Sequence, residues 1–125
     1  MTTIAAIDHV QIAIPPGGEA VARAFYADLL GLTEVPKPAS MAARGGAWYQ
    51  TGGVKVHLGV EQDFRANDKA HVAFRVSDVA GLADKAHAHG FKVKHDDELP
   101  GHVRAFIYDP FGNRIEILKP IGEGV

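Results

Sequence analysis

Four side chains that can bind a metal ion recur at matching places in the two halves of this sequence: His9, His57, His71 and Glu116. His9 and His71 each lie near the start of a short β-type run that opens its half, and His57 and Glu116 each lie in the run that closes it. Such ligands, with coordination positions left open, allow a divalent ion to bind substrate oxygens and stabilise negative charge on them. The chain has no cysteine, so the expected cofactor is one divalent ion held by nitrogen and oxygen ligands: Zn, Ni, Co, Fe or Mn.

These positions belong to an internal repeat. The spacing from His57 to Glu116 also separates three further pairs, Gly31 and Gly90, Tyr49 and Tyr108, and Gly53 and Gly112. Extra residues around the Pro15-Pro16-Gly17-Gly18 break explain the slightly larger spacing between His9 and His71. Equivalent residues of two repeated modules should therefore meet at one site.

The hydrophobic pattern predicts the elements that position these residues. Strands are expected over 4–14, 32–38, 47–51, 54–60, 69–76, 91–95, 102–108 and 113–118, and helices over 19–30 and 78–89. Segment 39–46 is expected to be a loop, segment 61–69 a linker, and Ser77 the cap of the second helix. The result is an α+β fold with two tandem βαβββ modules, about 4–60 and 69–118, in a single domain over 1–125.

Side chains alternate across a strand, and this decides which residues accompany the ligands. Gln11 and Arg114 should share the cavity side, whereas Val10, Val56 and Ile115 should face the helices. Of the neighbours Trp48 and Tyr49, one should face the cavity.

Composition excludes several classes of function. The net charge is −2 and no basic stripe is present, so we expect no nucleic-acid partner. No long apolar run or leader pattern is visible, so we expect no membrane span and a cytoplasmic location.

Four motifs carry a resemblance to a known family. They are Ile7-Asp8-His9-Val10, Phe25-Tyr26-Ala27-Asp28-Leu29-Leu30-Gly31, Ala70-His71-Val72-Ala73-Phe74 and Asp109-Pro110-Phe111-Gly112-Asn113-Arg114-Ile115-Glu116. In this order they resemble the vicinal oxygen chelate superfamily of glyoxalase I, bleomycin-resistance proteins and extradiol dioxygenases. The resemblance implies curled mixed sheets that form an open cup around a metal ion, and a homodimer.

The resemblance also implies roles for individual residues. His9, His57, His71 and Glu116 would be the metal ligands, with Glu116 also a catalytic base. The substrate would bind through adjacent oxygens in a lyase, isomerase or dioxygenase reaction. Side chains expected to line the substrate pocket are Gln11, Tyr49, Phe106 and Tyr108.

Two departures and two alternatives stand beside this interpretation. Common glyoxalase I enzymes have glutamate where this chain has His57, and extradiol dioxygenases have tyrosine where it has Phe106. The alternative function is a non-catalytic, bleomycin-resistance-like protein that binds a small molecule or antibiotic. The alternative role for Glu116 is a salt bridge with Arg114 or Arg75.

Overall fold

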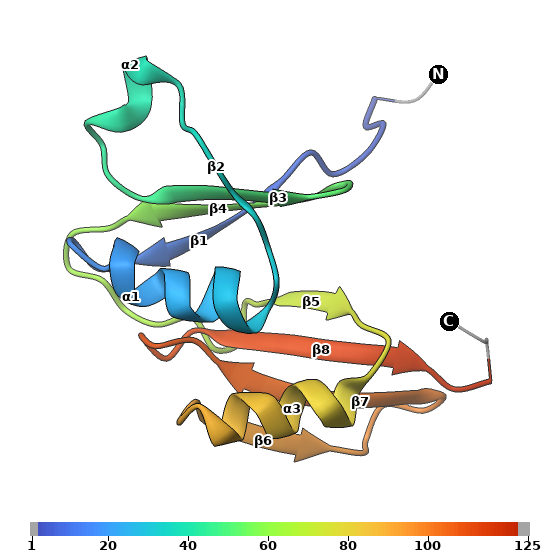
Figure 1. Ribbon diagram of the computed structural model, residues 1–125. Coiled ribbons are helices and arrows are strands. Elements are labelled where there is room, and N and C mark those ends of the chain that lie inside the picture. The colour runs from blue at the N-terminus through green and yellow to red at the C-terminus, as the bar shows by residue number, and fades with distance from the viewer. Residues whose placement is uncertain (1–2, 123–125) are drawn as a thin grey trace. The chain divides into compact units, whose positions relative to one another are not determined.

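The computed structural model describes residues 3–122 and divides the chain into two compact units, Met1–Phe64 and Arg65–Val125 (Figure 1). The boundary lies inside the polar segment 61–69 that composition predicts to be a linker. Each unit holds one four-stranded sheet with its own helices.

The first unit contains strands β1 (Val10–Ile14), β2 (Glu34–Val35), β3 (Ala47–Thr51) and β4 (Val54–Val60). Its helical segments are α1 (Glu19–Arg23), the π-helix η1 (Ala24–Leu29) and α2 (Ala39–Ala42). The strand order is β1-β4-β3-β2, in which β1 runs parallel to β4 and the other pairs are antiparallel.

The second unit contains β5 (Val72–Arg75), α3 (Val79–Ala88), β6 (Val93–Asp96), β7 (His102–Tyr108) and β8 (Arg114–Pro120). Its strand order is β5-β8-β7-β6, with β5 parallel to β8. The two sheets therefore have the same topology, and the predicted α+β fold of two βαβββ modules is confirmed.

The register shows the repeat residue by residue. Gln11 pairs with His57 in the first sheet, and the corresponding pair in the second sheet is Ala73 with Glu116. The expected match of Tyr49 with Tyr108 is wrong by one residue: Trp48 pairs with His57, whereas Phe106 pairs with Glu116. The reason is that the stretch from Phe106 to Glu116 is one residue longer than the stretch from Trp48 to His57.

Each sheet buries one face against its helices. In the first unit the buried side chains include Ile12, Ile14, Val56, Phe25 and Tyr26. In the second, α3 contacts β7 and β8, and its buried side chains are Val79, Ala83 and Ala86. Val56 and Ile115 are buried and Val10 is half-buried, in agreement with the predicted alternation.

The element boundaries differ from the predictions at both histidines. Strands β1 and β5 begin at Val10 and Val72, so His9 and His71 lie just before their strands. At the other end β8 continues to Pro120, so the tail expected from Lys119 is part of the sheet. Pairing of Val103 with Lys119 extends this strand.

The helices also differ in detail. The predicted helix over 19–30 changes at Ala24 into a π-helix and ends before Gly31, whose φ is 76°. The predicted loop 39–46 contains the short helix α2. Asp78, and not Ser77, caps α3, because its side chain accepts a hydrogen bond from the Gly81 amide. No helix among residues 3–122 is long and apolar enough to cross a membrane.

Candidate functional site

His71 and Glu116 form a direct pair in the second unit. His71 lies just before β5 and Glu116 on the neighbouring β8, and the His71 Nε2 atom is 2.9 Å from Glu116 Oε1. The other ring nitrogen, Nδ1, is 2.9 Å from the Lys69 carbonyl oxygen. Glu116 is a buried carboxylate, with 7% of its surface exposed.

Hydrogen-bond chemistry favours one orientation of the His71 ring. A carbonyl oxygen only accepts, so Nδ1 of His71 donates to Lys69 and Nε2 is left facing the carboxylate. A histidine ligand held through Nδ1 by a backbone carbonyl is a common arrangement around metals. The pair therefore has the donor set and the support that a metal ligand pair needs.

Arg104 forms an ion pair with the second carboxylate oxygen of Glu116. Its Nη1 atom is 3.4 Å from Glu116 Oε2, and its Nε donates to Asp96. The hydrogen bond from Arg104 lowers the pKa of Asp96, and the same bond raises the pKa of Arg104. Neither Arg114 nor Arg75 forms the alternative salt bridge predicted for Glu116, because the cation that reaches it comes from the paired strand β7.

Phe106 and Tyr108 lie on the same face of the sheet as Glu116. Phe106 pairs directly with Glu116 and meets the His71 ring edge to face, with the ring centroids 5.7 Å apart. The Arg114 guanidinium lies over the Phe106 ring at 4.5 Å, and its Nε donates to the Tyr108 hydroxyl at 3.2 Å. Two aromatic rings and an arginine thus lie on the face that carries Glu116, and their role in lining a substrate pocket stays a prediction.

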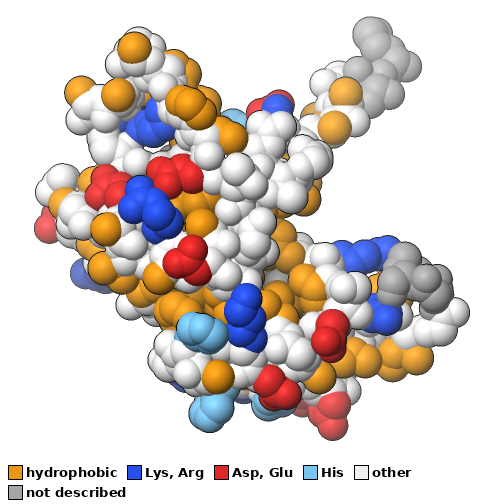
Figure 2. All heavy atoms as spheres, viewed as in Figure 1, with side chains coloured by type: hydrophobic (Ala, Val, Ile, Leu, Met, Phe, Trp, Pro, Cys, Tyr) orange, Lys and Arg blue, Asp and Glu red, His pale blue; other side chains and the backbone are white. Residues whose placement is uncertain are grey.

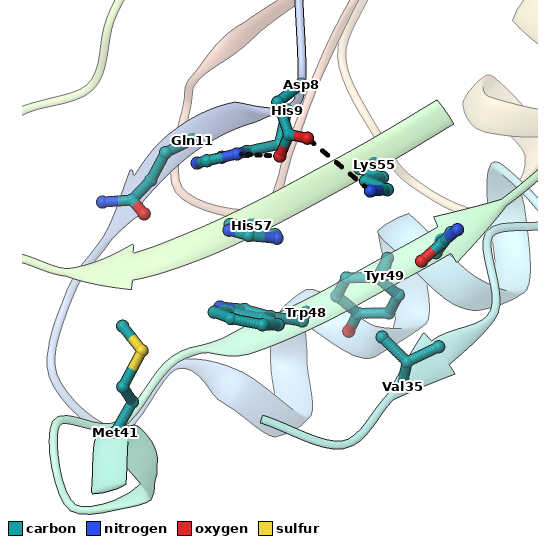
Figure 3. A pocket seen from close by; sticks show the side chains of 10 residues that line it. Asp8, His9, Gln11, Val35, Met41, Trp48, Tyr49, Lys55 and His57 are labelled. Atoms are coloured by element: carbon teal, nitrogen blue, oxygen red, sulfur yellow. Dashed lines mark hydrogen bonds and ion pairs between the residues drawn. The ribbon is translucent and has the colours of Figure 1, made fainter. Parts of the chain in front are cut away.

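The first unit has its own pocket, of about 400 Å³, on the face that carries His9 and His57 (Figure 3). His57 is sandwiched between two rings, with centroid distances of 4.1 Å to His9 and 4.0 Å to Trp48. Trp48, Met41 and Val35 supply an apolar side to the pocket, and Asp8, Gln11 and Lys55 a polar one.

The two imidazoles of this pocket have different local partners. Burial, and then the nearby His9, lower the pKa of His57, so this ring stays neutral near pH 7. His9 donates through Nδ1 to Asp8 at 2.9 Å, and this bond lowers the pKa of the Asp8 carboxyl. The Nε2 lone pair of His9 is consequently available to a ligand.

The stacking limits what His9 and His57 can do together. Their ring planes are inclined by only 22°, and an imidazole lone pair lies in the plane of its ring. Both rings could coordinate one ion only if one of them left the stack. As arranged, His9 offers the donor atom and His57 supports it from behind.

Gln11 and Tyr49 differ in their exposure to solvent. Gln11 is exposed beside His57, in the predicted position. Tyr49 is buried, and its ring lies 6.0 Å from that of Tyr26. Within residues 3–122 its hydroxyl has no hydrogen-bond partner, and burial raises its pKa. Trp48 and Tyr49 both line the pocket, and Trp48 is the one whose ring stacks on His57.

The two ligand pairs lie in different units, and their convergence on one ion stays a prediction. Within the described part of the chain, no group of three histidine, aspartate or glutamate side chains is arranged to hold a metal. Each unit instead presents a pair whose histidine has Nδ1 engaged locally, by Asp8 in one case and Lys69 in the other.

Comparison with known proteins identifies the family of the chain. The model of the Glyoxalase/Bleomycin resistance protein/Dioxygenase superfamily matches residues 6–117. The chain belongs to this superfamily. No curated protein matches the chain significantly.

Solved structures of the superfamily share the fold. A putative glyoxalase family protein from Bacillus anthracis is 41% identical, with a TM-score of 0.90 and coverage of 96% of this chain and 98% of that one. The fosfomycin resistance protein FosX from Listeria monocytogenes is 14% identical, with a TM-score of 0.76 and 98% of both chains covered. TnmS3, an antibiotic-binding protein from a Streptomyces species, is 19% identical, with a TM-score of 0.69 and coverage of 96% and 99%.

Proposed function

We propose that this glyoxalase-superfamily chain is a metal-dependent enzyme of the lyase, isomerase or dioxygenase type, acting on a small substrate with two adjacent oxygens. The ligands are His9, His71 and Glu116, with His57 as the fourth candidate. The observation that supports the proposal is the His71–Glu116 pair, in which the Lys69 carbonyl orients the histidine and Nε2 faces Glu116 Oε1 at 2.9 Å. When bound, a divalent ion would polarise the substrate oxygens.

The residues around the pair have distinct tasks in this proposal. Glu116, when detached from the ion, would accept a proton from the substrate at Oε1 and return it. Arg104 orients the carboxylate through Oε2 and limits its movement. Phe106 excludes water from one side of the pair, which strengthens the electrostatic interactions there.

A non-catalytic binding protein is the second candidate. The observation in its favour is that Glu116 already has two cationic or proton-sharing partners, His71 and Arg104, and needs no ion for charge balance. In that case Trp48 would be a wall of the binding pocket in the first unit.

Metal content separates the two candidates. The protein is purified without a histidine tag, its bound metal is measured by mass spectrometry, and the metal-free form is titrated with Zn, Ni, Co, Mn and Fe(II) in a calorimeter. We expect one ion per chain, and at least a ~10- to 100-fold loss of affinity in His71→Ala and Glu116→Gln. His57→Ala should lose less, because His57 supports His9 from the stack.

The matched control is His87→Ala, an exposed histidine on α3 whose loss should leave metal affinity unchanged. Absence of stoichiometric binding by all five ions would support the binding protein instead. We also propose a homodimer, for which light scattering should give twice the 13.4 kDa mass of one chain.

A further inference from the structure

A second cavity lies at the turn end of the sheet in the second unit. It measures about 570 Å³ and is lined by residues of β6, the β7–β8 turn and the start of β8. Three of its side chains are cationic: Lys92, Lys94 and Arg114. Tyr108 contributes its ring and hydroxyl.

The negative charges at this cavity are already engaged. Asp68 pairs with Arg114 Nε at 2.8 Å and is largely exposed. Asp109 is turned inward, where its carboxylate accepts hydrogen bonds from the Phe111 and Asn113 amides and holds the turn. Each of these carboxylates therefore has a structural partner of its own.

The lysines are not neutralised in this way. Among residues 3–122, neither Lys92 nor Lys94 has a carboxylate within ion-pair distance, although the Lys92 ammonium lies over the Tyr108 ring at 4.5 Å. The contacts of the Arg114 side chain with Asp68 and Tyr108 both run through Nε, and its two Nη groups supply further N–H donors. The Tyr108 hydroxyl accepts from Arg114, which leaves its own hydrogen to donate.

We propose that this cavity is an anion-binding subsite for a carboxylate, phosphate or phosphonate group of the substrate. Two lysine ammonium groups, the Arg114 Nη donors and the Tyr108 hydroxyl form a donor set matched to an oxyanion. The proposal that this cavity binds an anion depends only on these residues. Its assignment to the substrate rests on the proposed metal-dependent function.

The position of the cavity sets the size of the substrate. Arg114 and Glu116 lie two residues apart on β8 and point to the same face, a step of about 7 Å along the strand. An anionic group held at Arg114 would thus be separated by roughly that distance from oxygens held at Glu116. The substrate class is a short molecule with an anionic group at one end and two adjacent oxygens at the other.

Amide NMR of the metal-free protein tests the subsite without involving the ion. A chelator is used to strip the metal and is then removed, and inorganic phosphate, methylphosphonate and acetate are titrated separately at constant ionic strength. We expect saturable shifts at residues 92–94 and 108–114, with phosphate dissociation constants on the order of 1 mM. Lys92→Gln and Lys94→Gln should each weaken phosphate binding by about fivefold.

Lys85→Gln is the matched control, since Lys85 is an exposed lysine on α3 and its loss changes the net charge equally. Shifts that do not saturate, or that Lys85→Gln weakens as much as the other two variants, would overturn the subsite. Stronger binding of phosphate and methylphosphonate than of acetate assigns a phosphorus oxyanion, and the reverse order a carboxylate. Metal affinity is measured separately, so failure of this subsite and failure of the proposed function give different results.

Discussion

At the scale of single residues, the candidate site depends on side chains that are held by well-defined neighbours. His71 has both nitrogens facing acceptors, His57 is kept neutral by burial between two rings, and Glu116 is held from both oxygens. The residue types and the face they occupy could be predicted from spacing and alternation. Their contact partners Lys69, Arg104 and Trp48 could not be predicted in this way. They are brought to the site by strand register and local turns, which spacing does not give.

Glu19 gives a residue-scale prediction that is independent of the site. Its Oε2 accepts a hydrogen bond of 2.7 Å from the Gly46 amide, and this bond holds the pKa of the carboxyl below its ordinary value. The folded chain then binds this proton less tightly than the unfolded chain does. The stabilisation is present above the unfolded pKa of about 4.3 and is lost as pH falls through the lower folded value.

Urea unfolding of Glu19→Gln across pH checks this expectation. At neutral pH the substitution should lower the free energy of unfolding by about 1 kcal/mol, a value discounted for solvent screening of a half-exposed group. The difference from the unmodified chain should shrink as the pH drops below about 4. The exposed Glu61→Gln is the control, and a pH-independent loss in Glu19→Gln would contradict the charge argument.

At the scale of elements, strand and helix ends depend on individual contacts. The order of strands and helices was predictable, because alternation and helical spacing are properties of short windows. The ends were not: β1 starts only where Val10 finds Val56 on β4, and the π-helix Ala24–Leu29 depends on how Phe25 and Tyr26 are buried. Such contacts are long-range and leave no signal in a window.

The cap of α3 is a prediction at this scale. The Asp78 carboxylate accepts from the Gly81 amide at 2.9 Å, so Asp78→Ala leaves an amide of the first turn unsatisfied. We expect a loss of about 1 kcal/mol in the free energy of unfolding, measured by chemical denaturation. Ser77→Ala should change it by much less. Equal losses in the two variants would favour Ser77 as a second cap.

At the scale of the whole molecule, the two units share one topology. Each has one candidate ligand histidine whose Nδ1 atom is hydrogen-bonded to a nearby residue. Basic and acidic side chains are interspersed on the face shown in Figure 2. The doubling of the fold could be predicted from repeated glycines and ligand positions. Whether the two halves act on a common ion depends on their mutual placement, which no repeat pattern contains.

A shared ion has a consequence that one fluorophore can report. Trp48, in the first unit, is the single tryptophan of the chain and lies 4.0 Å from His57, which stacks in turn on His9. If His9 and Glu116 are ligands of the same ion, the charge placed on His9 at the end of this stack should change Trp48 emission. Glu116→Gln, a change in the other unit, should then abolish the response.

The measurement is a fluorescence titration of metal-free protein with the ion that binds most tightly. Under a shared site, His9→Ala and Glu116→Gln both lose the emission change, and His87→Ala keeps it. At an ion concentration ~100 times its dissociation constant, the unmodified protein should also gain about 2.7 kcal/mol in stability, and each ligand variant should lose most of that gain. An emission change that persists in Glu116→Gln would mean that the first unit binds the ion by itself, and the shared centre would be wrong.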